Sequence, residues 1–171
     1  MSAAIATRQS REDLRRRYRP HVVRMLFVGE APPASGRFFY CANSGLYRAV
    51  RGVFGDTFPG IGDTDFLTEF QRRGCYLVDL CGTPVDRLSP AERTRICIES
   101  EPRLAAALRE SRPSILVTLV RSIAPNVRRA LARANCSCSL VEVPYPGRWK
   151  KHRQEFARLL GPVLREQLGG R

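Results

Sequence analysis

Glu30 stands where an apolar run ends and a stiff loop begins. It follows RMLFVG and precedes APPASGRFFY, so two prolines, an arginine and three aromatic residues come close behind one carboxylate. Gly29 permits close approach to the backbone, while Pro32 and Pro33 restrict the loop and remove backbone donors. A carboxylate fixed in this way can orient a water molecule for attack or stabilise a cationic transition state. The alternative is an ion pair between Glu30 and one of the chain's many arginines.

The segments that would position Glu30 alternate between strand and helix. Near-continuous apolar runs predict strands, and apolar residues at helical spacing predict the helices between them. This order is typical of a parallel sheet covered on both faces, so we expect an α/β fold with three α/β/α layers and a four-stranded parallel sheet. The strands are expected within residues 21–29, 75–80, 114–120 and 139–143.

Several expected helices have recognisable ends. Gly55 ends a helix that begins near residue 43, and Ser89 followed by Pro90 begins another. The C-terminal segment is expected to form one or two basic amphipathic turns, interrupted at Gly161-Pro162. The remaining helices are expected within residues 10–20, 65–74, 102–111 and 124–135.

Ligands of open parallel sheets bind beyond the carboxyl ends of the strands. The segments that follow the strands should therefore lie together at one rim of the sheet. We expect this rim to be formed by residues 29–40, 79–86, 120–126 and 143–149.

The composition of the 171-residue chain fits one domain with a short extension. We expect a basic arm or helix over residues 1–20 and a single domain over residues 21–171. With 29 Lys and Arg against 16 Asp and Glu, the net charge of +13 favours a polyanionic partner such as nucleic acid. Solvated basic faces are the alternative explanation of this charge.

Several classes of protein are disfavoured. No apolar run reaches the roughly 18 residues of a membrane span, and the N-terminus lacks an apolar segment of signal-peptide length, so we expect a cytoplasmic protein. Neither GxGxxG nor GxxxxGK[ST] occurs, which argues against dinucleotide and P-loop nucleotide binding. None of the six cysteines forms a CxxC pair. Free thiols and no metal are therefore expected, and Cys136 with Cys138 is the one pair considered for a metal.

The stretch LFVGEAPPASGRFF resembles the first motif of the uracil-DNA glycosylase superfamily, in members whose loop reads Gly-Glu-Ala-Pro and is followed by Gly-Arg-x-Phe. YCANSGLYRAV is similar to the mismatch-specific branch, which carries an Ala-Asn pair before a helix with an aromatic residue. The resemblance continues through GCYLVDL to VPYPGRW and covers most of the chain after Pro20. It implies the fold expected above and an enzyme that flips a base out of DNA and hydrolyses its N-glycosidic bond.

The resemblance also implies roles for single residues. Glu30 and Ala31 lie in the loop that orients water, Phe39 stacks on the flipped base, and Asn43 belongs to the base site. The most active uracil enzymes carry Asp at the position of Ala31, so Glu30 is the candidate catalytic carboxylate. Tyr145 occupies the position of a histidine that supports O2 of the leaving base. Its hydroxyl can donate to the same oxygen but cannot become a cation; the alternative is that Tyr145 only packs.

Asp79, at the end of the second expected strand, stands where uracil-reading members usually carry Asn. A carboxylate accepts hydrogen bonds, as from cytosine N4, whereas an amide both donates and accepts. A protonated Asp79 in a closed pocket would also donate to cytosine N3. Uracil presents the opposite pattern at its 4-position, so the prediction is a pocket for cytosine or a modified cytosine. The alternative is that Asp79 caps the loop that follows it.

The family holds DNA with the loop after its fourth strand and the helix that follows. Trp149 would stack or intercalate there, or else anchor the rim. The family's iron–sulfur branches carry a close N-terminal cysteine pair that this chain lacks, so no cofactor and no metal are expected. The candidate DNA contacts are Arg37, Arg121, Arg148, Trp149, Lys150 and Lys151.

The resulting hypothesis is a monofunctional DNA glycosylase that leaves an abasic site. Its target would be cytosine or a hydroxymethylated or glucosylated cytosine, with a role against phage DNA. Uracil excision in base-excision repair is the conservative alternative, and a catalytically inactive nucleic-acid-binding protein is another. A hydrolase of free nucleotides fits the basic charge less well. DNA is the expected partner, and no membrane or obligate protein partner is expected.

Overall fold

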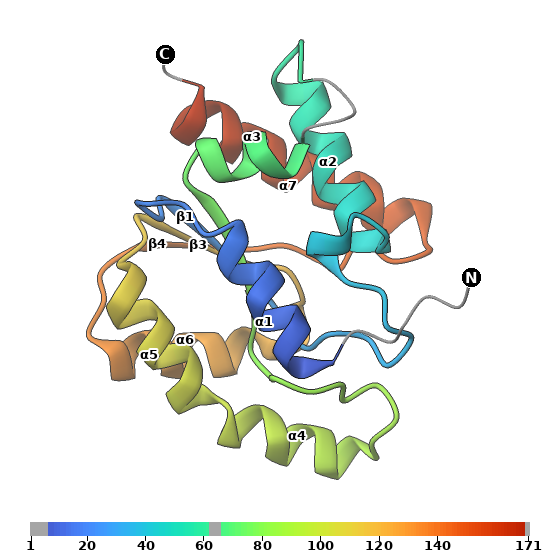
Figure 1. Ribbon diagram of the computed structural model, residues 1–171, viewed down its shortest axis with the longest axis vertical. Coiled ribbons are helices and arrows are strands. Elements are labelled where there is room, and N and C mark those ends of the chain that lie inside the picture. The colour runs from blue at the N-terminus through green and yellow to red at the C-terminus, as the bar shows by residue number, and fades with distance from the viewer. Residues whose placement is uncertain (1–6, 62–65, 170–171) are drawn as a thin grey trace.

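The computed structural model describes residues 7–61 and 66–169. A parallel sheet with strand order β2-β1-β3-β4 forms its centre. Helices cover both faces of this sheet, so the expected three-layer α/β/α fold with four parallel strands is confirmed (Figure 1). The strands are β1 (Met25–Gly29), β2 (Cys75–Asp79), β3 (Ile115–Thr118) and β4 (Ser139–Glu142).

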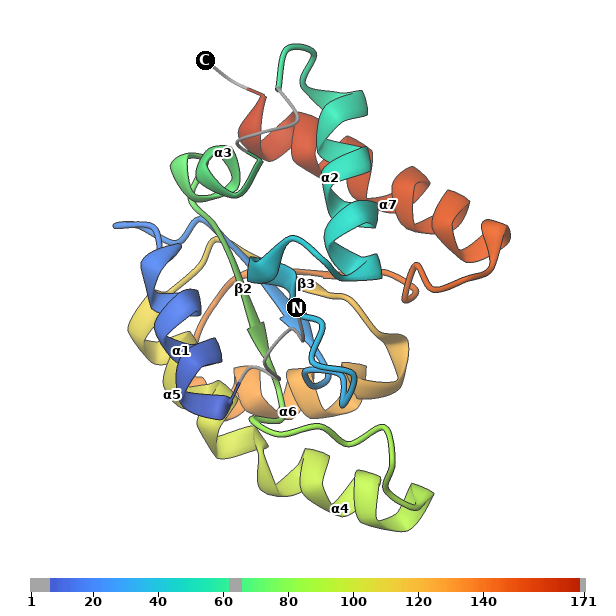
Figure 2. The same ribbon diagram turned by 45° about the vertical axis from the view of Figure 1, so that its right-hand side comes forward.

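The helices form two layers, one on each side of the sheet (Figures 1 and 2). On one side lie α2 (Gly45–Thr57), α3 (Phe66–Arg72) and α7 (Lys150–Leu168), and α2 packs along α7. On the other side lie α4 (Pro90–Glu99), α5 (Glu101–Ser111) and α6 (Ala124–Ala134), and α5 packs along α6. Two short 3-10 turns, η1 (Phe39–Cys41) and η2 (Arg121–Ile123), lie in the connections.

Burial explains why the strands are continuous apolar runs. Every residue of β1, β2 and β3 is buried, because helices cover both faces. β4 lies at the outer edge of the sheet, and none of its residues is fully buried. Phe27 of β1 packs against an aromatic cluster formed by Phe54, Phe66 and Phe70 of α2 and α3. This cluster fixes the layer that carries α2 over the carboxyl end of β1.

The basic helix expected before Pro20 is present as α1 (Arg8–Arg17), and it lies beside the edge strand β2, where Arg15 contacts Asp79 (Figure 2). Tyr18, just after α1, stacks on Tyr40 of η1 with 5.6 Å between ring centroids. The Tyr40 hydroxyl donates to the Leu77 carbonyl (3.0 Å) and accepts from the Leu77 amide (2.7 Å). The backbone groups on the outer edge of β2 are thus paired at this point, and α1 and η1 are tied to the end of the sheet where the site forms.

Two predicted helix boundaries are wrong. α2 continues past Gly55 to Thr57, and α7 runs as one helix through Gly161-Pro162. Past Gly55, the helix is continued by hydrogen bonds from the Thr57 hydroxyl to the Val53 carbonyl and from the Phe58 amide to the Phe54 carbonyl. In α7, apolar packing outweighs the helix-breaking tendency of Pro162, because a buried stripe continues across it. In α7 this stripe is Phe156, Leu160, Leu164 and Leu168, and Pro162 faces solvent.

Candidate active site

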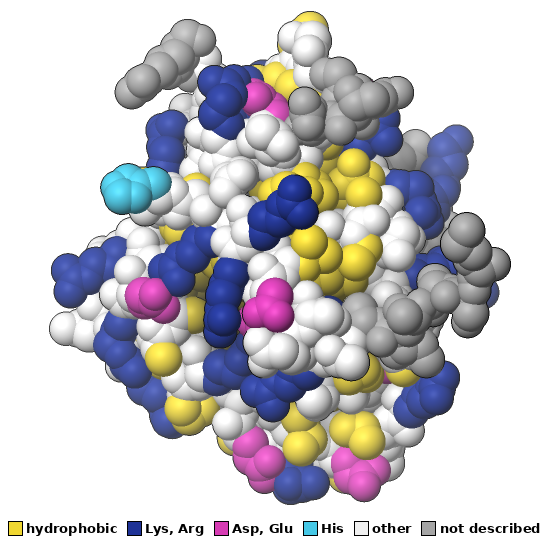
Figure 3. All heavy atoms as spheres, viewed as in Figure 1, with side chains coloured by type: hydrophobic (Ala, Val, Ile, Leu, Met, Phe, Trp, Pro, Cys, Tyr) yellow, Lys and Arg dark blue, Asp and Glu magenta, His cyan; other side chains and the backbone are white. Residues whose placement is uncertain are grey.

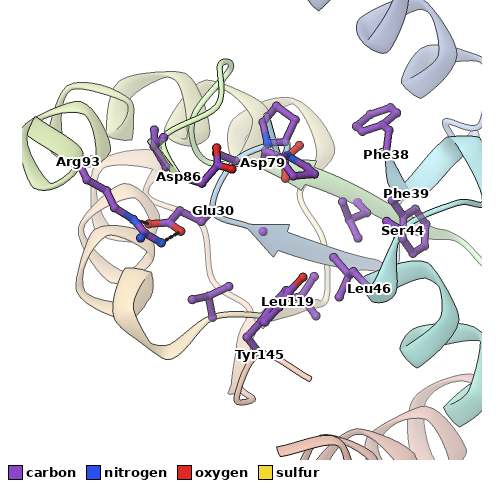
Figure 4. A pocket seen from close by; sticks show the side chains of 17 residues that line it. Glu30, Phe38, Phe39, Ser44, Leu46, Asp79, Asp86, Arg93, Leu119 and Tyr145 are labelled. Atoms are coloured by element: carbon purple, nitrogen blue, oxygen red, sulfur yellow. Dashed lines mark hydrogen bonds and ion pairs between the residues drawn. The ribbon is translucent and has the colours of Figure 1, made fainter. Parts of the chain in front are cut away.

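A cavity of about 340 Å³ lies at the carboxyl end of the sheet. All four segments that follow the strands contribute to its wall, so the predicted rim is confirmed. Glu30, Asp79 and Asp86 supply carboxylates, while the rest of the labelled wall is largely apolar and aromatic (Figure 4). A mainly apolar cavity with a few polar groups at fixed positions is typical of a site for a small planar group. We refer to this space as the rim cavity.

Glu30 lines the rim cavity and also forms the ion pair that was its alternative role. Its two carboxylate oxygens accept from Nε (2.6 Å) and Nη2 of Arg93. Arg93 lies on α4, whose first turn is fixed by a capping box between Ser89 and Glu92. The hydrogen bond to Glu30 raises the pKa of the Arg93 guanidinium. A carboxylate whose two oxygens are both held by a guanidinium has a fixed direction, which suits it to orienting water or stabilising positive charge.

Asp79 also lines the cavity, but its side chain is almost completely buried. Oδ2 accepts from Nη2 of Arg15 on α1 at 2.8 Å, and the Asp79 backbone carbonyl accepts from Nη1 of Arg103 at 2.7 Å. Burial raises the pKa of Asp79, and the charge of Arg15 opposes that rise. Among the described residues, this carboxylate therefore accepts its hydrogen bond from Arg15, and not from a backbone amide of the following loop.

Gly29 is the register partner of Asp79 on the neighbouring strand. A Cβ atom at this position would lie 2.8 Å from Oδ1 of Asp79, so any larger residue would displace the carboxylate. The glycine that ends β1 therefore leaves room for Asp79, in addition to allowing approach to the backbone.

Phe39 is buried and contributes to the cavity wall. Its ring makes edge contacts with Tyr40 and Tyr47 and a tilted contact with Phe70, which hold it in one orientation. Phe38 lines the same cavity, and the Arg15 guanidinium lies 5.3 Å from its ring centroid. Two phenylalanines are thus available to contact a planar ligand, and the sequence reasoning singled out only Phe39.

The other predicted base-site residues differ in their placement. Ala31 and Tyr145 line the rim cavity. Tyr145 remains 46% exposed, and burial raises the pKa of its hydroxyl, which therefore stays a donor at neutral pH. Asn43 is not among the residues of the cavity wall; its Oδ1 accepts from the Phe38 amide at 2.8 Å and so fixes the loop that carries Phe38. The Tyr145 side chain closes the cavity on the side opposite Asp79 (Figure 4).

A second hollow, of about 710 Å³, adjoins the rim cavity and shares Pro33, Ser44 and Tyr145 with it. Within the described parts of the chain, no carboxylate lines this space or pairs with Arg37, Arg48 or Arg148. We call it the arginine hollow. The cations that line it are Arg37, Arg48, Arg148 and Arg153.

The remaining predicted DNA contacts lie outside both cavities. Trp149 precedes α7 and is 66% exposed, and Lys150 and Lys151 form the exposed first turn of that helix. Positive side chains at a helix N-terminus oppose the helix dipole, so they do not contribute to the stability of α7 there. Arg121 forms an ion pair with Glu155 (2.7 Å) and does not line the arginine hollow.

The cysteines are spread over several elements of the fold. Within residues 7–61 and 66–169, no three His, Cys, Asp or Glu side chains are grouped to hold a metal ion. All six cysteines are free thiols, and Cys136 with Cys138 has no third ligand. Cys81 and Cys97 lie 3.7 Å apart between their sulfur atoms, and burial raises the pKa of Cys97 to about 12. These buried thiols remain protonated.

Sequence reasoning missed several residues of the site. Arg15 lies 64 positions before Asp79 and Arg93 lies 63 after Glu30, so no local motif connects either pair. Arg48 had a usable signal, because it lies one turn into the helix that follows the Ala-Asn pair. Arg153 had a similar one, at the start of the last helix.

Comparison of the sequence with protein-family models found no matching family, and comparison with curated proteins found no match.

Proposed function

We propose that the protein is a DNA glycosylase that removes a pyrimidine base by hydrolysis and leaves an abasic site. The observation that carries the proposal is the direct contact between the rim cavity and the arginine hollow. A flipped nucleotide has this same two-part character, with a planar base at one end and phosphates at the other. The resemblance of the GEAPP loop to the uracil-DNA glycosylase superfamily supports the same activity.

In this proposal the base enters between the phenylalanines and Tyr145. Glu30, held by Arg93, orients a water molecule toward C1′ and stabilises the positive charge that develops on the sugar. The C1′–N1 bond breaks with its electron pair on the base, the water oxygen bonds to C1′, and the proton that this water loses passes to the released base through solvent. Tyr145 donates a hydrogen bond to O2 of the departing base, since its raised pKa keeps the hydroxyl protonated. Asp79 accepts from an exocyclic amino group, which favours cytosine or a modified cytosine over uracil.

DNA as the polyanionic partner fits the distribution of charge. The arginine hollow and the first turn of α7 place cations around the mouth of the rim cavity. Lys and Arg side chains also gather on the face formed by α1 and α5 (Figure 3). We place the protein in the cytoplasm, where its six free thiols are stable. Among the described residues, no helix is long and apolar enough to span a bilayer.

The experiment is an excision assay on duplex and single-stranded oligonucleotides. Each carries one cytosine, 5-hydroxymethylcytosine, glucosylated 5-hydroxymethylcytosine, uracil or hypoxanthine, and alkali converts an abasic site into strand scission. Scission at a cytosine-type base supports the defence role, and scission at uracil alone supports repair. Glu30→Gln is the matched inactive control, because it keeps the size of the side chain while removing its charge.

The Glu30–Arg93 ion pair favours one other candidate, a nucleic-acid-binding protein without catalysis. If Arg93 neutralises Glu30 permanently, the rim cavity retains a base without cleaving it. Binding of DNA with no scission on any substrate would select this second function.

A further inference from the structure

The carboxylate of Asp79 is held by α1, which lies before the first strand of the sheet. Nη2 of Arg15 contacts Oδ2 of Asp79 at 2.8 Å, and side-chain exposure is 5% for Arg15 and 8% for Asp79. Nη1 of Arg15 also donates to Glu12, and its guanidinium lies against the ring of Phe38. Arg15 is thus fixed from three sides, and its position is set by packing rather than by solvent.

Because of this contact, the two carboxylate oxygens of Asp79 have different surroundings. Oδ2 is occupied by Arg15, while Oδ1 lies against Gly29, which also lines the rim cavity. An ionised carboxylate can only accept hydrogen bonds, and the guanidinium of Arg15 favours this ionised form, against the burial that raises the pKa of Asp79. The group presented to a base is therefore one acceptor oxygen with a fixed direction.

We propose that Arg15 is a positioning residue that sets the base preference of the rim cavity, by holding Asp79 so that Oδ1 accepts from an exocyclic amino group. The proposal rests on the proposed function and extends it, since it assigns base selection to the N-terminal helix. Cytosine-type bases satisfy Oδ1 with their N4 amino group, whereas the O4 atom of uracil meets a second acceptor.

The electrostatic surroundings of Asp79 give the proposal a dependence on pH. Burial raises the pKa of Asp79, and Arg15 is the largest of the influences that lower it. Without Arg15, burial is opposed less and the pKa of Asp79 rises further. A neutral carboxyl group that Arg15 no longer holds can turn its O–H toward O4 of uracil or toward N3 of cytosine, so the discrimination set by one fixed acceptor is lost. The other charged or titratable groups that act on Asp79 or respond to its charge are Arg11, Glu12, Tyr40, Cys81 and Arg103.

The test compares Arg15→Met with Arg15→Lys, which keeps the positive charge. Binding of free cytosine and free uracil to each protein is measured by NMR between about pH 5 and 8, and base release is measured on matched duplexes. We expect Arg15→Met to lose about tenfold or more of the preference for cytosine, as for loss of a hydrogen bond to a charged group. The loss should be largest at low pH, and Arg15→Lys should retain most of the preference.

A double-mutant cycle separates positioning from a merely structural role. Arg15→Met leaves a buried carboxylate without its partner and is expected to destabilise the fold, whereas Arg15→Met combined with Asp79→Asn leaves no such charge. If Arg15 acts through Asp79, the double variant should have the same base preference as Asp79→Asn alone. A preference that changes equally in both backgrounds would overturn the proposal.

Two further outcomes also decide the question. An unchanged preference in folded Arg15→Met across the pH range would overturn the proposal, as would a wild-type protein that binds neither free base. If no protein releases a base from DNA but the free-base preferences shift as expected, the proposed catalysis fails while the role of Arg15 stands.

Discussion

The arginine hollow leads to a quantitative prediction for the salt dependence of DNA binding. Each cation that neutralises a phosphate of duplex DNA contributes about −0.9 to the slope of log affinity against log salt concentration. Removing two such cations should therefore make the slope less steep by about 1.8. The double variant Arg37→Gln/Arg48→Gln is suited to this test, because both side chains line the hollow and neither forms an ion pair with a described carboxylate.

The magnitude follows from the cations around the mouth of the rim cavity. If six of them contact phosphate, raising salt from about 50 to about 200 mM should weaken wild-type binding roughly 1,800-fold, and the double variant roughly 150-fold. The six are Arg37, Arg48, Arg148, Arg153, Lys150 and Lys151.

The assay is fluorescence anisotropy of a labelled duplex, titrated at five or more salt concentrations. Arg72→Gln/Arg112→Gln is the matched control, since it removes the same charge just before β2 and β3, at the opposite end of the sheet. The control should keep the wild-type slope. An equal slope for wild type and Arg37→Gln/Arg48→Gln would refute phosphate binding in the arginine hollow, and an equal effect of both double variants would show that only net charge matters.

Three other predictions concern catalysis and stability. Glu30→Gln should lower base release by about 100-fold or more while DNA binding persists, as measured by single-turnover kinetics and anisotropy; full activity would exclude Glu30 from the reaction. Tyr145→Phe should slow base release about tenfold, because one hydrogen bond to the departing base is lost. Wild-type activity should not fall between about pH 7 and 9 through ionisation of Tyr145, because burial raises the pKa of its hydroxyl. Gly55→Ala should stabilise the protein by about 1 kcal/mol in urea denaturation, since a Cβ at this helical position meets no atom within 4 Å; destabilisation would contradict the helical continuation to Thr57. Gly74→Ala should destabilise the protein, because the φ of Gly74 is +75° and the added Cβ would lie 2.9 Å from Arg24.

Local sequence patterns were sufficient for the sheet and for the rim. Apolar runs mark the strands because both faces are buried, and the rule for ligands at the carboxyl ends of strands places Glu30, Asp79 and Tyr145 at one cavity. The same patterns failed at Gly55, where the helix continues although the glycine is exposed, and at Gly161-Pro162, where the buried face of α7 lies against Val53 and Thr57 of α2.

The ion pairs of the site were not predictable from the sequence. A chain with 29 Lys and Arg offers many partners for each carboxylate, and spacing does not distinguish among them. Only the packing of α1 beside β2 selects Arg15 for Asp79, and only the direction of α4 selects Arg93 for Glu30. The role of Asn43 in holding the loop that carries Phe38 was also not predictable, because its contact with the Phe38 amide depends on the path of that loop.

Direct detection of the released base tests the central claim most sharply. A duplex containing 5-hydroxymethylcytosine, with its glucosylated and uracil counterparts, is incubated with wild-type protein or Glu30→Gln, and the small-molecule fraction is analysed by mass spectrometry. The account predicts a free cytosine-type base in amounts equal to the abasic sites formed, and at least about 100-fold less with Glu30→Gln over the same time. Intact DNA and no free base from any substrate, at protein concentrations that saturate binding, would contradict it.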